Sequence, residues 1–374
     1  MSHLIGNFSV LRSSRVFVLL TFFIAFCFGT NAQVPNEAEV IAAADKVMAA
    51  ATSPKPAPGC AVGISLDSKS IYEKAFGMAE LEHGIANTPQ TIFESGSVAK
   101  QFVSASIILL SLEGKLKIDD PVRKYIPELP DYGRPLTIRH MLNHTSGLRD
   151  WGAVMGITGV GRGERIISQA LAIDVVMQQR DVDFTPGSEY SYSNSGYQLL
   201  TEIVERVSKQ SLPEFTKKRF FEPLVMTNSS WRTDYKTLVP GRAQAYAGRR
   251  NGPWQLSMPF MNVYGNGGML TTVGDWLKWN KMLETRSMGA PLVEMMETNG
   301  ILNDGRKITY ALGIGVSEYK GLKQISHGGA TAGYRTFLGR WPELKTSIAV
   351  LCNGSSMNPG GIARRIVDRV APKL

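Results

Sequence analysis

Ser97 and Lys100 stand three residues apart in the segment ESGSVAK (94–100), and a long apolar stretch follows them up to Leu112. A helix that begins near Ser97 would place both side chains on one face. A partly desolvated lysine can accept the hydroxyl proton, and a helix N-terminus favours negative charge beside it. The spacing is therefore typical of an activated serine nucleophile. A helix N-cap followed by a solvated lysine is the alternative interpretation of the same residues.

Tyr192 and Asn194 form a second group, in a polar segment rich in turn-forming residues. In an extended segment, side chains two positions apart point the same way, so both would face one site. A tyrosine near a cation can act as general acid or base, and an asparagine can hold a substrate amide or a lysine ammonium. An ordinary turn with an exposed tyrosine is the alternative interpretation.

A third group lies at the end of a predicted strand, where His327 precedes Gly328, Gly329 and Ala330. The two glycines would let a substrate lie along the strand edge. A backbone N–H at Ala330, opposite that of Ser97, would complete an oxyanion hole. A simple β-turn with a surface histidine is the alternative interpretation.

Other kinds of chemistry find less support in the sequence. His140 and His144 are four apart on a predicted helix, as in metal pairs, but neither the H-E-x-x-H pattern nor a third ligand accompanies them. We expect no metal site. There is no G-x-S-x-G elbow, which argues against the α/β-hydrolase fold, and no G-x-x-x-x-G-K phosphate loop.

The composition is that of a soluble globular protein: 374 residues, 43% hydrophobic and 20% charged. The formal charge is +9, but lysines and arginines are scattered rather than clustered with aromatic residues, so we expect no nucleic-acid partner. The first residues carry two arginines, an apolar core and a small-residue end, which predicts a secretory signal peptide over 1–32. A lipid anchor on Cys27 and an uncleaved membrane anchor are the less favoured alternatives.

Export permits disulfides, and two cysteines remain after cleavage, Cys60 and Cys352. Both lie in strand-like runs far apart in the sequence. A bridge between them stays open, but we expect two buried free thiols.

The order of the predicted elements indicates an α+β fold. Strands are expected near both ends of the mature chain, over 60–66, 70–76, 310–318, 322–327, 334–341 and 347–352. Helices fill the middle, and further helices over 37–51 and 361–370 would cover the sheet. The pattern predicts an antiparallel sheet (about 37–95 and 306–374) with an inserted helical lobe (about 96–305) and a site between them.

The motifs Ser97-Val98-Ala99-Lys100, Tyr192-Ser193-Asn194 and His327-Gly328-Gly329 resemble, in order and spacing, those of serine β-lactamases and penicillin-binding proteins. The resemblance is closest to the class C type and its related esterases and D-peptidases. It extends to the flanking sequences LKIDDP (116–121), HTSGL (144–148) and GGML (267–270), and so covers nearly the whole mature chain.

The resemblance implies roles for single residues. Ser97 would be the acylated nucleophile, and Lys100 its proton acceptor or electrostatic partner. Tyr192 would be the general base and acid, and Asn194 a polar guide for the substrate. The backbone N–H groups of Ser97 and Ala330 would hold the oxyanion. No metal or organic cofactor would be needed.

The third motif departs from the Lys-Thr-Gly of dedicated β-lactamases, because His327 replaces the lysine and Gly328 the hydroxyl residue. A histidine is only partly charged near neutrality, so a β-lactam carboxylate would be held less well.

We therefore expect a periplasmic or secreted monomeric serine hydrolase that acts on D-alanyl peptides, esters or β-lactam-like amides. A D-alanyl-D-alanine carboxypeptidase, D-aminopeptidase or esterase is favoured over an efficient β-lactamase. The substrate would be a small molecule or derived from peptidoglycan. A penicillin-binding sensor, or a peptidoglycan-binding protein with little turnover, is the alternative.

Overall fold

The computed structural model describes residues 34–52, 55–159, 166–248 and 253–371. All of them belong to one compact unit, Ala32–Leu374. The predicted signal peptide lies outside the described residues. Within the described residues, none of the helices has both the length and the apolar character needed to span a membrane.

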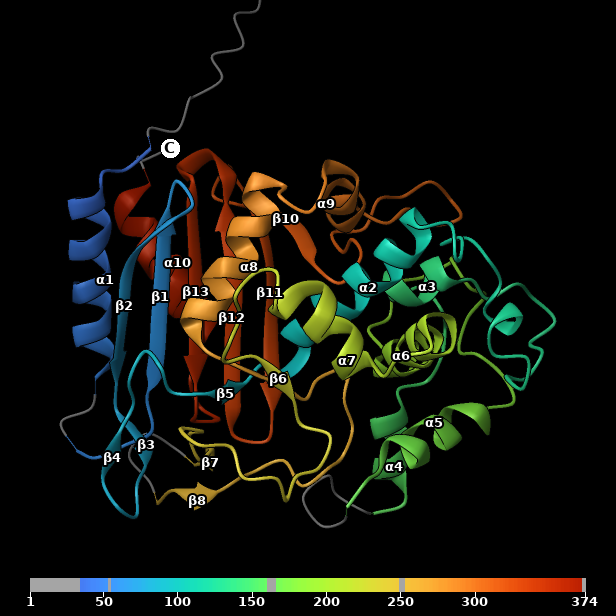
Figure 1. The fold of residues 1–374 in the computed structure, drawn as a ribbon, viewed down its shortest axis with the longest axis horizontal. Coiled ribbons are helices and arrows are strands. Elements are labelled where there is room, and N and C mark those ends of the chain that lie inside the picture. The colour runs from blue at the N-terminus through green and yellow to red at the C-terminus, as the bar shows by residue number, and fades with distance from the viewer. Residues whose placement is uncertain (1–33, 53–54, 160–165, 249–252, 372–374) are drawn as a thin grey trace, which may run out of the picture. The chain divides into compact units, whose positions relative to one another are not determined.

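Six antiparallel strands form the main sheet, in the order β10-β11-β12-β13-β1-β2 (Figure 1). Their bounds are β10 Gly315–Tyr319, β11 Leu322–Thr331, β12 Tyr334–Trp341, β13 Thr346–Cys352, β1 Cys60–Leu66 and β2 Lys69–Phe76. The two ends of the chain therefore meet in this sheet, where β1 pairs with β13. This confirms the predicted α+β class with an antiparallel sheet built from both ends.

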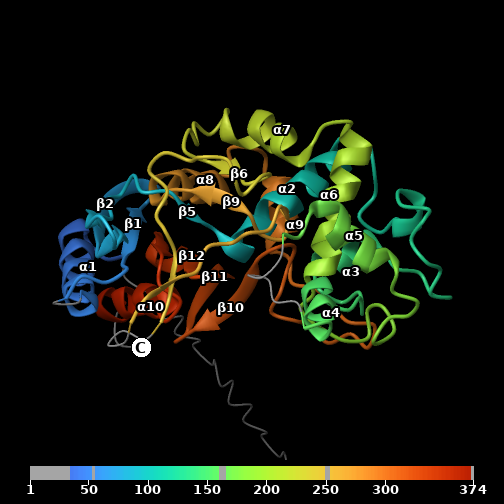
Figure 2. The same ribbon diagram turned by 90° about the horizontal axis from the view of Figure 1, so that it is seen from below.

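Alternating side chains of β1 show why helices cover both faces of the sheet. Val62 and Ile64 belong to a core shared with α1 (Glu37–Ala51) and α10 (Pro359–Val370). Between them, Gly63 faces the opposite side, where an added Cβ would come within 3.0 Å of Val273 in α8 (Val273–Thr285). Figure 2 shows α8 on one side of the sheet and α1 and α10 on the other. This is the period-two pattern of a strand that is buried on both faces.

The strand pairing also joins the two cysteines. The register of β1 against β13 places Cys60 opposite Cys352 with their Cα atoms 4.0 Å apart, and the two form a disulfide. The prediction of two free thiols was therefore wrong. Both cysteines do lie in buried strands, as expected, but the sequence alone did not identify these strands as neighbours.

The second part of the fold is helical, and α2 (Lys100–Leu112) runs through its centre with nearly every residue buried. Around it lie α3 (Ile138–Leu142), α4 (Trp151–Ile157), α5 (Gln169–Met177), α6 (Asn194–Ser208), α7 (Leu212–Thr216) and α9 (Ala290–Glu297). Short turns complete it: the 3₁₀ turns η1 (Gly96–Ala99) and η2 (Val122–Lys124), and the π-helical turn η3 (Lys217–Phe221). A further 3₁₀ turn, η4 (Pro342–Leu344), connects β12 to β13 in the main sheet.

Several very short strands connect these parts. β5 (Phe93–Glu94), β9 (Met269–Thr271) and β6 (Ser230–Trp231) form a small sheet. The others are β3 (Met78–Glu80), β4 (Ile85–Ala86), β7 (Tyr246–Ala247) and β8 (Gln255–Leu256). Three of these strands lie within 227–259, a segment that the sequence pattern does not resolve, because two-residue strands show no period.

Candidate active site

A glycine with left-handed backbone brings Ser97 against the main sheet. The small sheet holds the preceding residue, since the backbone N–H of Ser95 donates to the carbonyl of Met269 at 2.8 Å. Gly96 follows with φ +52°, and an added Cβ would lie 2.5 Å from the backbone N of Ala330. Only glycine fits this conformation and this close approach. The backbone at Ser97 therefore lies beside β11, on which Ala330 is found.

The predicted helix start is wrong by one turn, and this leaves the Ser97–Lys100 pair intact. Ser97 lies in η1 rather than at an α-helix N-cap, and α2 begins at Lys100. Because the 3₁₀ turn leads directly into the helix, Lys100 Nζ still lies 3.2 Å from Ser97 Oγ. A hydroxyl can accept from the amine or donate to it, so this contact is a route for a proton.

The amine of Lys100 is completely buried and is held by carbonyl oxygens. Its Nζ donates to Asn194 Oδ1 at 2.8 Å and to the backbone carbonyl of Asn266 at 2.7 Å. The carbonyl of Asn266 belongs to a loop that Gln198 of α6 holds through Asn266 Oδ1 at 2.8 Å. A buried amine held in this way has a fixed position next to the Ser97 hydroxyl.

Asn194 begins a helix rather than lying in an extended segment, which corrects the predicted geometry. Ser193 is the N-cap of α6 and Asn194 its first residue. Asp150 Oδ2 accepts from the backbone N–H of Asn194 at 2.8 Å and from its Nδ2 at 2.7 Å. Because the carboxylate takes both donors, the amide oxygen of Asn194 must face Lys100. Sequence reasoning missed Asp150, which stands 44 residues from its partner.

Tyr192 lies beside the Lys100 amine. Its ring centroid is 4.9 Å from Lys100 Nζ, a cation–π distance. Part of the ring is exposed (38%), but enclosure of the phenol raises its pKa, and a hydrogen bond with Ser97 offsets this only in part. The phenol is therefore protonated near neutral pH and can donate a proton.

The buried ring of His144 packs against the ring of Tyr192. The ring of His144 lies 4.0 Å from that of Tyr192, tilted by 34°, and also contacts Tyr310 at 4.6 Å. Burial, with Lys100 and His327 nearby, lowers the pKa of His144 well below its usual value, so the ring is neutral. The expectation that His140 and His144 share a helix was wrong, because α3 ends at Leu142 and His144 has φ +60°.

His327 is buried and neutral. Its Nδ1 lies 2.6 Å from the carbonyl of Gly328, which can only accept, so Nδ1 carries the proton. Its Nε2 then accepts from the hydroxyl of Tyr310 at 2.9 Å. Burial and the nearby Lys100 lower the pKa of His327 to about 4. The sequence predicted partial charge at neutrality, and the enclosure removes it.

Gly329, two residues after His327, brings β11 against the start of η1. An added Cβ on Gly329 would lie 2.0 Å from the carbonyl oxygen of Ser95. The hydroxyl of Thr336, on the adjacent strand β12, donates to the same oxygen at 2.7 Å. Gly329 is therefore needed for the close packing that places β11 next to η1, the turn that holds Ser97.

Ser97 lines a pocket of about 50 Å³ together with Asn194, Asn266 and Ala330. Its remaining walls include the apolar residues Trp151, Met261 and Val263 and the charged residues Glu94 and Arg232.

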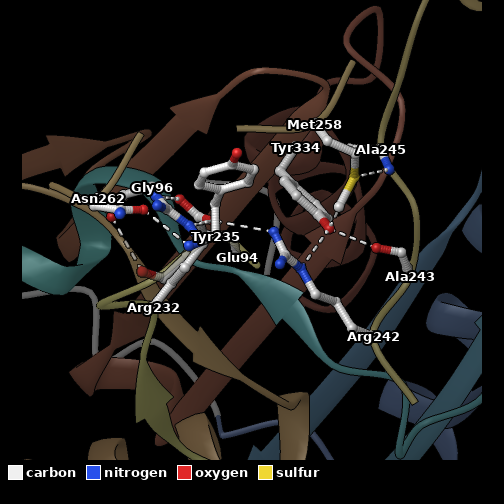
Figure 3. A network of polar contacts seen from close by, with 11 residues as sticks. Glu94, Gly96, Arg232, Tyr235, Arg242, Ala243, Ala245, Met258, Asn262 and Tyr334 are labelled. Carbon is white, nitrogen blue, oxygen red and sulfur yellow. Dashed lines mark hydrogen bonds and ion pairs between the residues drawn. The ribbon is translucent and has the colours of Figure 1, made fainter. Parts of the chain in front are cut away.

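The charged residues belong to a buried network (Figure 3). Arg232 donates to both carboxylate oxygens of Glu94, at 2.9 and 3.0 Å, and Arg242 approaches the same carboxylate at 3.4 Å. Sequence reasoning missed this pair, because Glu94 and Arg232 are 138 residues apart and form no local motif.

Comparisons of the sequence and of the structure with known proteins agree on one protein family. The sequence profile of the family described as "Beta-lactamase" matches residues 45–373. A D-aminopeptidase from Brucella anthropi is 28% identical over 280 residues, which is 74% of this chain and 52% of that protein. A D-aminopeptidase from Brucella canis matches with the same identity. The chain thus spans about half the length of the curated relatives it matches.

Solved structures share the fold. The octameric penicillin-binding protein homologue from Pyrococcus abyssi is 30% identical, with a TM-score of 0.76 over 88% of this chain and 76% of that one. A D-amino acid amidase from Ochrobactrum anthropi is 21% identical, with a TM-score of 0.74 over 90% of this chain and 98% of that one. The Pyrococcus abyssi homologue is octameric, so it lends no support to the predicted monomer. The profile match, which covers most of the sequence, and the shared architecture establish that the chain belongs to the beta-lactamase family.

Proposed function

We propose that the chain is a serine hydrolase that forms an acyl-enzyme on Ser97 and releases the acyl group to water. The contact between Ser97 Oγ and the buried amine of Lys100 carries this proposal. In the first step Lys100 takes the Ser97 proton while Oγ attacks the substrate carbonyl carbon. The backbone N–H groups of Ser97 and Ala330 would stabilise the resulting oxyanion.

Tyr192 completes the first half of the reaction. Its protonated phenol donates a proton to the leaving nitrogen or oxygen as the bond to the acyl carbon breaks. The proton held by Lys100 replaces the one that Tyr192 gave away, so both groups return to their starting charge. In the second half Lys100 takes a proton from water, and the hydroxide attacks the acyl carbon. The bond from that carbon to Ser97 Oγ then breaks, and Oγ takes the proton back from Lys100.

The neutral His327–Tyr310 pair favours leaving groups without a carboxylate. Since His327 has lost its charge, it offers no cation for a carboxylate on the leaving group. Amides and esters fit better than efficient β-lactam hydrolysis, and the D-aminopeptidase relatives support D-amino acid derivatives as substrates. We also propose export to the periplasm or beyond, on the basis of the signal predicted over 1–32.

Intact mass and steady-state turnover would test the proposal. The protein is incubated with a penicillin and, separately, with an activated ester, as wild type, Ser97→Ala and Ser111→Ala, a matched serine at the far end of α2. We expect an adduct or steady product release that Ser97→Ala abolishes and Ser111→Ala retains. An adduct that clears indicates a hydrolase, and one that persists indicates a penicillin-binding sensor. Absence of adduct and turnover with both reagents would contradict the proposal.

A further inference from the structure

An arginine with unused donors lines the pocket of the nucleophile. Arg232 is 3% exposed, and its backbone N–H is held by the carbonyl of Gly268 at 2.7 Å. Its Nε and Nη2 are used by Glu94, whereas Nη1 is buried with no hydrogen-bond partner among the described residues. A buried donor of a charged group without a partner is costly in a folded protein. It is therefore a place where a ligand can supply the missing acceptor.

The charges of the network do not balance. One carboxylate, Glu94, faces two guanidinium groups, Arg232 and Arg242, and Figure 3 shows them reaching it from different sides. Burial alone would lower the pKa of Arg232, but Glu94 outweighs this and raises it, so Arg232 is cationic. The excess charge at this wall of the pocket is positive, and it is poorly screened by solvent.

The position of Tyr192 indicates which part of a substrate meets Arg232. Tyr192 would protonate the leaving group, so the leaving group lies on the side of Tyr192 and His327. Neither residue lines the pocket that Ser97 shares with Arg232. With the carbonyl carbon at Ser97, the acyl part of the substrate is then directed into that pocket. A volume of about 50 Å³ admits a small group.

We propose that Arg232 Nη1 binds a carboxylate on the acyl part of the substrate, close to the scissile carbonyl. This specificity rests on the proposed acyl-enzyme function. Among the amides and esters of the proposed function, it ranks a carboxylate on the acyl part above a free α-ammonium next to the scissile bond, because that cation would face the guanidinium. Glu94 is a poor partner for that cation, since it is fully buried and already faces two guanidinium groups, Arg232 and Arg242.

The wild-type protein tests the proposal through three matched sets of p-nitroanilides. The first carries malonyl, succinyl or glutaryl groups, and the second carries the same groups with the free carboxylate replaced by a carboxamide. The third carries β-alanyl or 4-aminobutanoyl groups, which end in an ammonium. Each compound yields kcat/KM or, where it is not cleaved, an inhibition constant against p-nitrophenyl butyrate. We expect at least one carboxylate to be preferred about tenfold or more over its carboxamide and over the ammonium compounds.

Two variants assign the preference to one residue. Arg232→Gln removes the charge and leaves Glu94 with Arg242, and it should bring the ratio of carboxylate to carboxamide close to one. Arg242→Gln is the matched control, because it disturbs the same carboxylate but Arg242 does not line the pocket. We expect that control to reduce the preference much less than Arg232→Gln does, because it removes the excess charge but keeps the Nη1 donor.

The outcomes separate this inference from the proposed function. Acylation of Ser97 with no preference for a carboxylate in the wild type overturns the inference alone, even where Arg232→Gln does not fold. Equal preference in wild type and folded Arg232→Gln also overturns it. A lack of any acylation by ester or penicillin overturns the proposed function and this inference with it.

Discussion

Asp150 shows how one carboxylate sets the geometry of the site. Its Oδ2 takes both donors of Asn194, and its Oδ1 caps α4 through the backbone N–H of Gly152 at 2.9 Å. The carboxylate therefore fixes the start of two helices relative to each other. It also turns the Asn194 amide so that an oxygen, rather than an N–H, meets the Lys100 amine. Without that acceptor the buried Lys100 amine would lose its 2.8 Å contact and would keep those to the Asn266 carbonyl and to Ser97.

The burial of His327 predicts how the free energy of unfolding depends on pH. The pKa of His327 is about 4 in the folded protein, against about 6.5 in an unfolded chain. Between these values the unfolded chain binds a proton that the folded protein does not. The contribution of neutral His327 to the free energy of unfolding is therefore fully present above about pH 6.5 and is lost as the pH falls towards 4. The full loss is about 3 kcal/mol, and the lowered pKa of His144 acts in the same direction.

Denaturant unfolding at pH 7 and pH 4.5 measures this effect. We expect the wild type to lose more unfolding free energy between these pH values than His327→Gln does, by about 2–3 kcal/mol. The variant loses the hydrogen bond with Tyr310 at both pH values, so the comparison of the two slopes isolates the proton. Equal pH dependence of the two proteins would show that His327 titrates normally in the folded state.

At the scale of elements, long periodic segments were predictable and their pairing was not. The helices over 37–51 and 361–370 and the strands over 60–66 and 334–341 were expected within about two residues of where they lie. These segments have a clear apolar period. Which strands become neighbours depends on contacts across nearly the whole sequence, and the disulfide was missed for this reason.

The disulfide of β1 and β13 should contribute strongly to stability. It joins residues 292 apart, so it restricts a very long loop in the unfolded chain. We expect the double variant Cys60→Ala/Cys352→Ala to lose about 2–5 kcal/mol of unfolding free energy. The measurement is denaturant unfolding of both proteins, with the reduced wild type as a control that should match the double variant.

Thiol labelling checks the bond itself. Unfolded, unreduced protein is alkylated and digested, and the peptides that contain Cys60 and Cys352 should carry no label. Labelled thiols at both positions, or equal stability of wild type and double variant, would contradict the bond.

At the scale of the whole molecule, the site is assembled from distant parts of the chain. Ser97 and Lys100 were found from the sequence because their spacing is local, and the Tyr192 and His327 motifs because they resemble a known family. Asp150, Arg232 and Tyr310 form no motif with their partners, since they meet them only through the fold. Residues that position other groups through the fold are therefore less visible in a sequence than residues that belong to a local motif.

A shared core predicts that the sheet and the helical part unfold together. One apolar cluster includes Ala349 and Leu351 of β13, Trp276 of α8 and Ile107 of α2. Since no polar boundary separates these elements, we expect a single cooperative transition in denaturant. Activity, tryptophan fluorescence and far-UV circular dichroism should then be lost with one midpoint. Loss of activity at lower denaturant, with most circular dichroism retained, would instead show that the helical part opens first and that the cluster does not couple the two.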